Sequence, residues 1–157
     1  MALTKEQQNY WNSYLTSLPV DEHPSAPVIT AGPCGDYAIT DSLIQLYLGG
    51  QKTAGSGLVA DFNYCHDPLP KIGDYWIVLN SKKEPALIVN TIKVEFNQFG
   101  TIPRHVVLAE GEGDLSTAYW KQGHEKIFAP HLKTWGVDEL DKAEVITEHF
   151  KVVYNTP

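Results

Sequence analysis

The chain has 157 residues, 43% hydrophobic and 20% charged, a composition typical of one globular domain that can bury its own core. Its formal net charge is −7 and its only arginine is Arg104, which excludes the broad basic surface of a non-specific polyanion binder. No stretch approaches the ~20 apolar residues of a membrane span. No apolar run follows the first charged residues as in a signal peptide, so the sequence predicts a cytoplasmic protein.

The first segment predicts a helix that ends before Pro19. Thr4 and Gln7 have the spacing of a capping box. Behind them, four apolar residues recur at helical spacing: Trp11, Tyr14, Leu15 and Leu18. Residues 19–33 contain four prolines and are expected to form a connector. We therefore expect an N-terminal helix and proline-rich connector over residues 1–33 and one domain over residues 34–157.

The middle of the chain predicts a helix followed by strands. The helix runs from about Asp36 to Leu48, and Gly49 and Gly50 end it. Residues 51–57 are expected to form a glycine-rich loop or a strand edge. Residues 75–79 and 86–96 are rich in β-branched and aromatic side chains, which predicts two strands joined by a turn at residues 81–84.

The last third predicts helices and a closing strand. Residues 103–110 can form one or two helical turns, and Asp114 or Ser116 can cap a helix that extends to about Phe128. Residues 145–154 alternate between apolar and polar side chains, as in a strand. This order of elements predicts an α+β protein, most easily closed as a small barrel with helices against it.

Two patches could carry chemistry. The first is Lys52 to Gly57, in which a lysine and two hydroxyls, Thr53 and Ser56, lie among small residues that let the backbone approach a ligand. Taken alone, this patch favours a tight turn with a solvated lysine. It lacks the glycine and lysine spacing of a phosphate-binding P-loop.

The second patch begins with Glu110 and Glu112, which lie too far from the following helix to be explained by capping. That helix carries Trp120 and His124, four residues apart and so on one face. An aromatic ring and a histidine beside acids could stack on a nucleobase and hydrogen-bond to it, although a tryptophan at this spacing also suits a core. The cysteines and histidines show no metal-ligand spacing, so we expect no metal and no cofactor.

Four separated motifs resemble the ASCH (activating signal cointegrator homology) domain over roughly residues 35–154. They are Gly50-Gln51-Lys52-Thr53-Ala54, Leu69-Pro70-Lys71-Ile72-Gly73-Asp74, Glu110-Gly111-Glu112-Gly113-Asp114 and Glu148-His149-Phe150-Lys151-Val152. The resemblance implies a PUA-like small β-barrel with flanking helices and an N-terminal helical extension. It also implies a cleft in which the lysine loop faces the acidic motif.

The resemblance implies RNA-related function, with catalytic roles for Lys52, Glu110, Glu112 and His124. The residues expected to contact a substrate are Thr53, Ser56, Tyr119 and Trp120. The sequence departs from the family twice. Gly55 stands where deacylating relatives have a threonine, so Ser56 would have to replace that hydroxyl, and His149 stands where many relatives have arginine.

Three functions follow as alternatives. The leading one is binding of single-stranded RNA in the Lys/Glu-lined cleft, with metal-independent ribonuclease activity in which a glutamate is the base, Lys52 the cation and His124 the acid. The second is an amidohydrolase that acts on an acylated nucleoside such as N4-acetylcytidine, which suits the net charge of −7 better. The third is non-catalytic binding of RNA or a small ligand.

Overall fold

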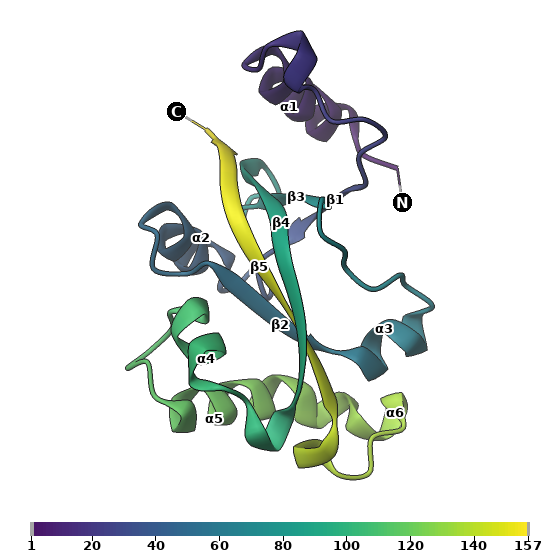
Figure 1. Cartoon of the computed structure of the whole chain (residues 1–157), viewed down its shortest axis with the longest axis vertical. Helices are drawn as coiled ribbons and strands as arrows, with labels where there is room; N and C mark the ends of the chain where they lie inside the picture. The colour runs from purple at the N-terminus through teal and green to yellow at the C-terminus, as the bar shows by residue number, and fades with distance from the viewer. Residues whose placement is uncertain (1, 157) are drawn as a thin grey trace. The chain divides into compact units, whose positions relative to one another are not determined.

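The computed structural model describes residues 2–156, which form two compact units. Unit 1 holds the chain up to Gly49, Ile72–Ile92 and the chain from Phe150, and unit 2 holds Gly50–Lys71 and Lys93–His149. Five strands pair in the order β1-β3-β4-β5-β2 (Figure 1). The two long strands, β4 (Pro85–Gln98) and β5 (Glu144–Asn155), each contribute residues to both units.

Unit 1 begins with helix α1 (Lys5–Thr16), which starts at the predicted capping box: the Thr4 hydroxyl accepts a hydrogen bond from the Gln7 amide, and the Gln7 side chain accepts one from the Thr4 amide. Trp11 and Tyr14 are buried against strands of this unit, as their spacing predicted. Strand β1 (Ile29–Pro33) lies within the predicted connector. It forms there because it pairs in parallel with β3 (Tyr75–Leu79).

The rest of unit 1 follows the predicted pattern. Strand β3 pairs antiparallel with the first part of β4. Helix α2 (Thr40–Leu48) starts later than expected, since the Asp36 carboxylate accepts hydrogen bonds from the amides of Ala38 and Ile39 and forms a separate turn. A second apolar core of this unit packs α2 on the strands: Cys34, Leu43, Ile44, Tyr47, Val78, Leu87, Val89 and Phe150.

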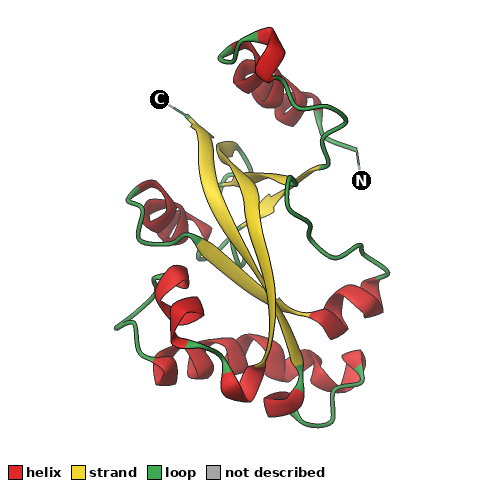
Figure 2. Ribbon diagram, in the orientation of Figure 1, coloured by secondary structure: helices red, strands yellow, loops and turns green. Residues whose placement is uncertain are grey.

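Unit 2 contains one complete strand, parts of β4 and β5, and four helices. Strand β2 (Ala54–Leu58) pairs antiparallel with β5, and Ser56 lies opposite Thr147. The helices are α3 (Val59–Cys65), α4 (Arg104–Glu110), α5 (Thr117–Phe128) and α6 (Leu132–Trp135). Helices α4 and α5 contact each other, and Figure 2 draws the helices in red. Short 3₁₀ turns of this unit lie at Phe99–Thr101, Ala129–His131 and Leu140–Lys142, and another lies in unit 1 at Val20–Glu22.

The core of unit 2 fixes α4 and α5 relative to β2. Its buried residues are Leu58, Phe99, Ile102, Val106, Val107, Trp120, Phe128 and Val145. Ser116 caps α5 by accepting a hydrogen bond from the Tyr119 amide, as predicted, and Asp114 in turn accepts from the Ser116 amide. Because β2 and the ends of α4 and α5 belong to one packed unit, side chains that they direct inward can meet.

Candidate functional site

Glu110 lies at the centre of a buried polar cluster in unit 2. Its side chain is 2% exposed, and its carboxylate Oε2 accepts hydrogen bonds from the Ser56 hydroxyl at 2.7 Å and from the indole N–H of Trp120. Its other oxygen, Oε1, lies 3.5 Å from Lys52 Nζ and 3.3 Å from His124 Nε2. The carboxylate is thus surrounded by four donors from two separate parts of the chain, residues 52–56 and α5.

Lys52 supplies a positive charge between two glutamates. Its side chain is 3% exposed, and Nζ donates to Glu112 Oε2 at 2.9 Å as well as facing Glu110. A lysine this deeply buried requires paired carboxylates, because burial of an unpaired ammonium carries a large desolvation penalty. The solvated lysine considered from the sequence is therefore wrong for this position.

Trp120 and His124 lie side by side on α5. Their rings are stacked with centroids 4.0 Å apart, and the His124 Nδ1 lies 2.8 Å from the Trp120 carbonyl oxygen. Trp120 is buried and also packs on Phe99, whereas His124 keeps 14% of its side chain exposed. The contacts of Trp120 are those of a core residue, and its predicted role in contacting a substrate stays a prediction.

The backbone next to the cluster is closely fitted. The Thr53 amide and hydroxyl both donate to the carbonyl of Ala109, which joins the start of β2 to the end of α4. Gly111 follows with φ +65°, and a Cβ atom there would lie 2.0 Å from the Gln51 carbonyl oxygen. Only glycine fits this conformation and this close approach, and the fit brings Lys52 to the glutamates.

The strand β2 determines which hydroxyl reaches Glu110. Ala54, Ser56 and Leu58 share one face, on which Ala54 and Leu58 are fully buried, and successive side chains of a strand point to opposite faces. A side chain at position 55 would therefore point away from the face that carries Ser56. Ser56 also lies 2.8 Å from the hydroxyl of Thr147, a buried partner that the sequence analysis missed although it lies on the alternating closing strand.

Tyr119 precedes Trp120 on α5 and has an exposed ring. Its side chain is 49% exposed, and its ring packs so closely on Gly113 that a Cβ there would lie 2.3 Å from a ring carbon. Three residues around it have left-handed backbone: Gly111, Gly113 and Leu115. The structure thus brings together Lys52, Ser56, Glu110, Glu112, Trp120 and His124, with Thr53 and Tyr119 adjacent to two of them in sequence, and their functional roles stay predictions.

A second ionic group of unit 2 surrounds Glu95 on β4. Its carboxylate contacts the Nε2 atoms of His105 at 2.7 Å and of His149 at 2.6 Å, and Lys93 lies 3.5 Å away. Burial alone would raise the pKa of Glu95, but the hydrogen bonds from the histidines and Asn97 lower it to about 2. His149 thus has a carboxylate partner on β4.

The same balance acts on the central pair. Burial would raise the pKa of Glu110, but the hydrogen bond and charge of His124, the charge of Lys52 and the indole N–H of Trp120 lower it to about 2. Burial would lower the pKa of His124, but the Glu110 hydrogen bond and charge raise it above 6.5. The carboxylate and the imidazolium each favour the charged form of the other.

We expect these two shifts to limit stability at both ends of the pH range. Because the pKa of Glu110 is lowered, its carboxylate stabilises the fold above pH 4.5, and this stabilisation is lost as the pH falls through about 2. Glu95, with a similarly lowered pKa, adds to the loss at acidic pH. The raised pKa of His124 stabilises the fold below 6.5, a contribution lost as pH rises through the folded pKa. In urea unfolding, Glu110→Gln should flatten the alkaline loss and part of the acidic loss, whereas Glu139→Gln, at an exposed ion pair, should leave both unchanged. If Glu110→Gln lost as much stability at alkaline pH as the wild type does, the His124–Glu110 pair would not be the cause of that loss.

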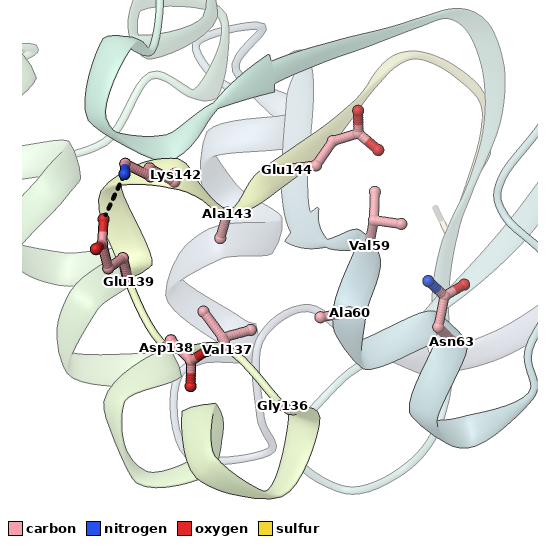
Figure 3. A pocket seen from close by; sticks show the side chains of 10 residues that line it. All are labelled: Val59, Ala60, Asn63, Gly136, Val137, Asp138, Glu139, Lys142, Ala143 and Glu144. Atoms are coloured by element: carbon pink, nitrogen blue, oxygen red, sulfur yellow. Dashed lines mark ion pairs between the residues drawn. The ribbon is translucent and has the colours of Figure 1, made fainter.

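A surface hollow of about 470 Å³ lies elsewhere in unit 2 (Figure 3). Its lining includes Val59, Ala60 and Asn63 from α3 and the segment Gly136–Glu139, and none of the predicted site residues. Lys142 and Glu139 at its edge pair with each other. The titratable residues in its lining are exposed, whereas Glu110 and Lys52 are buried.

The described residues 2–156 contain neither a group that could bind a metal ion nor a helix that could cross a membrane. No three or more His, Cys, Asp or Glu side chains are grouped so that they could hold a metal ion. Over the same residues, every helix is too short or too polar to cross a bilayer.

The fold and the cluster define a small α+β protein in which an edge strand and two helices hold a buried group of lysine, glutamate, serine and histidine. The ASCH domain family model matches residues 30–154, so the chain belongs to the ASCH domain family. This confirms the predicted resemblance and the PUA-like α+β fold class with its N-terminal helix. The predicted domain boundary at residues 33 and 34 stays a prediction.

Solved structures show the same fold. An ASCH domain from Lactobacillus crispatus JV V101 is 26% identical with a TM-score of 0.88, covering 99% of this chain and 98% of that chain. Protein EF3133 from Enterococcus faecalis V583 is 24% identical with a TM-score of 0.81, covering 98% of this chain and 91% of that chain. A comparison with curated proteins found no match.

Proposed function

We propose that the Glu110 cluster hydrolyses an acyl group from the amino group of a small nucleoside such as N4-acetylcytidine. The observation that carries this proposal is the 2.7 Å hydrogen bond from the Ser56 hydroxyl to a buried carboxylate that three further donors hold in place. A hydroxyl bonded to an oriented base is the arrangement that nucleophilic catalysis requires.

The charge of the cluster favours a neutral substrate over a phosphodiester. The positive charges of Lys52 and His124 are balanced by the negative charges of Glu110 and Glu112, all within contact distance. Lys52 is buried and engaged by both carboxylates, so little of its charge is left for a phosphate. A nucleoside carries no phosphate and needs no basic surface, which suits the net charge of −7.

The reaction would proceed in two steps. In the first, Ser56 Oγ bonds to the acyl carbon while its proton passes to Glu110, and the C–N bond breaks as His124 Nε2 gives a proton to the leaving amine. The proton on Glu110 then passes to His124, 3.3 Å away. In the second, the oxygen of a water bonds to the acyl carbon and the bond from Ser56 Oγ to that carbon breaks. One proton of the water goes to Ser56 Oγ, and the carboxylic acid leaves with the other. Lys52 is assigned a positioning role, since it keeps Glu110 ionised.

The substrate base would lie next to Tyr119. This ring is exposed yet held against Gly113, which suits it for stacking on a planar base. Thr53, whose side chain is at the surface, and Glu112, which is 31% exposed, could hydrogen-bond the edge of the base or the ribose.

The direct test measures release of cytidine from N4-acetylcytidine by wild type and by Ser56→Ala. We expect turnover in the wild type and a loss of about 10²–10⁴-fold in Ser56→Ala, because the attacking group is removed. Ser81→Ala, an exposed serine of unit 1, is the matched control and should keep wild-type turnover. Full activity in Ser56→Ala, or no turnover in the wild type, would rule the proposal out.

Binding of single-stranded RNA, with metal-independent cleavage, is the second candidate. It draws support from the exposed aromatic ring of Tyr119 and from the pairing of His124, as acid, with a carboxylate base. Titration of a short RNA at two salt concentrations would distinguish the two. Affinity that falls steeply with salt, and that Tyr119→Ala lowers further, would favour RNA. Affinity that does not change with salt would favour the nucleoside.

A further inference from the structure

His124 makes contacts that only a doubly protonated ring can satisfy. Its Nδ1 lies 2.8 Å from the Trp120 carbonyl oxygen, and a carbonyl oxygen only accepts. Its Nε2 lies 3.3 Å from Glu110 Oε1, and an ionised carboxylate also only accepts. A neutral ring has one N–H and would turn a lone pair toward one of these oxygens.

Trp120 acts on this ring in three ways. Its indole is stacked on the imidazole at 4.0 Å and 19°, and the face of an indole attracts a cation. Its carbonyl accepts from Nδ1, and its indole N–H donates to Glu110 Oε2, which holds the carboxylate in its ionised form on the other side of the histidine. Each of the three contacts favours the imidazolium over the neutral ring.

We infer that Trp120 is a positioning residue that holds His124 as an imidazolium, so that the cluster keeps a proton donor whose side chain is 14% exposed. This inference goes beyond the proposed reaction and holds for any ligand that needs a proton donor there. The charged groups that face His124 are Glu110 from α4 and Glu112 from the following loop, with Lys52 behind Glu110.

The test is a ¹⁵N NMR titration of the histidine rings in the substrate-free protein. In wild type we expect both ring nitrogens of His124 to be protonated at neutral pH. In Trp120→Phe, which keeps a stacked ring but loses the N–H donor, the His124 midpoint should move to lower pH, and in Trp120→Leu it should move further. If activity is present, the alkaline limb of its pH profile should move with the midpoint.

The chain provides a matched control. His131 and Trp135 form a second stacked pair in the same unit, with centroids 5.0 Å apart and an interplanar angle of 23°. Trp135→Leu should leave the His124 midpoint unchanged. A His124 ring with one protonated nitrogen in wild type, or a midpoint that Trp120→Phe and Trp120→Leu leave in place, would overturn the inference whether or not any substrate is turned over.

Discussion

Lys52→Ala is expected to lower the free energy of unfolding by about 3 kcal/mol, the lower end of the range for a broken buried ion pair, because the buried Glu110 carboxylate keeps His124 as its remaining cationic partner. Lys52 and Glu110 are 3% and 2% exposed, so solvent cannot replace the lost ammonium. Glu112, which is 31% exposed, can turn to water, so the loss falls mainly on Glu110. Urea unfolding monitored by circular dichroism measures the effect.

Lys142→Ala is the matched control for this variant. Lys142 pairs with Glu139 at 3.1 Å, but the two side chains are 74% and 63% exposed, and exposed pairs contribute ~0.5 kcal/mol or less. Equal effects of the two substitutions would show that the Lys52 pair is not buried in solution. A large loss also means that missing activity in Lys52→Ala reports unfolding as much as catalysis, which is why Ser56→Ala is the better catalytic test.

Gly111→Ala is expected to destabilise unit 2 by about 3 kcal/mol or more. The added Cβ would lie 2.0 Å from the Gln51 carbonyl oxygen and 3.1 Å from the Lys52 amide nitrogen, and both are backbone atoms that a rotamer change cannot move. The substitution should also separate Lys52 from the glutamates, so any activity should fall with stability. Thermal and urea unfolding measure the loss of stability, and the rate of N4-acetylcytidine hydrolysis measures the loss of activity.

Gly50→Ala separates the clash from the backbone conformation. Gly50 has φ +77°, as left-handed as Gly111, but a Cβ there meets no atom within 4 Å. We expect a loss of only ~1–2 kcal/mol from the conformation itself. If Gly111→Ala were no worse than Gly50→Ala, the close approach of the two chain segments would be absent in solution.

Periodicity and turn residues predicted most elements of the fold. The capping box of α1, the strands β3 and β4 and the helix α5 lie close to their predicted positions because each shows a local pattern of its own. Strand β1 and helix α3 were missed. Strand β1 is stabilised by parallel pairing with β3 rather than by its own composition, and α3 has only seven residues.

The candidate site was predicted in part. Proximity of Lys52 to the glutamates followed only from the family resemblance, since positions 52 and 110 are 58 positions apart in sequence and no local pattern links them. Burial was missed altogether: a lysine in a glycine-rich segment gives no sign that two carboxylates enclose it. Thr147 was missed because the pairing of β2 with β5 places it opposite Ser56. The Glu95 group was missed because its contact with His105 joins β4 to α4, which no local pattern predicts.

The order of the segments in unit 1 has a consequence for synthesis of the protein. The Tyr10 hydroxyl lies 3.0 Å from that of Thr156, and the ring of Tyr10 packs on that of Tyr154, although almost the whole chain separates them. Residues near both ends therefore complete the same packed unit. Until β5 has emerged from the ribosome, α1 has been made but lacks Tyr154 as a packing partner, so unit 1 can finish folding only after β5 has emerged.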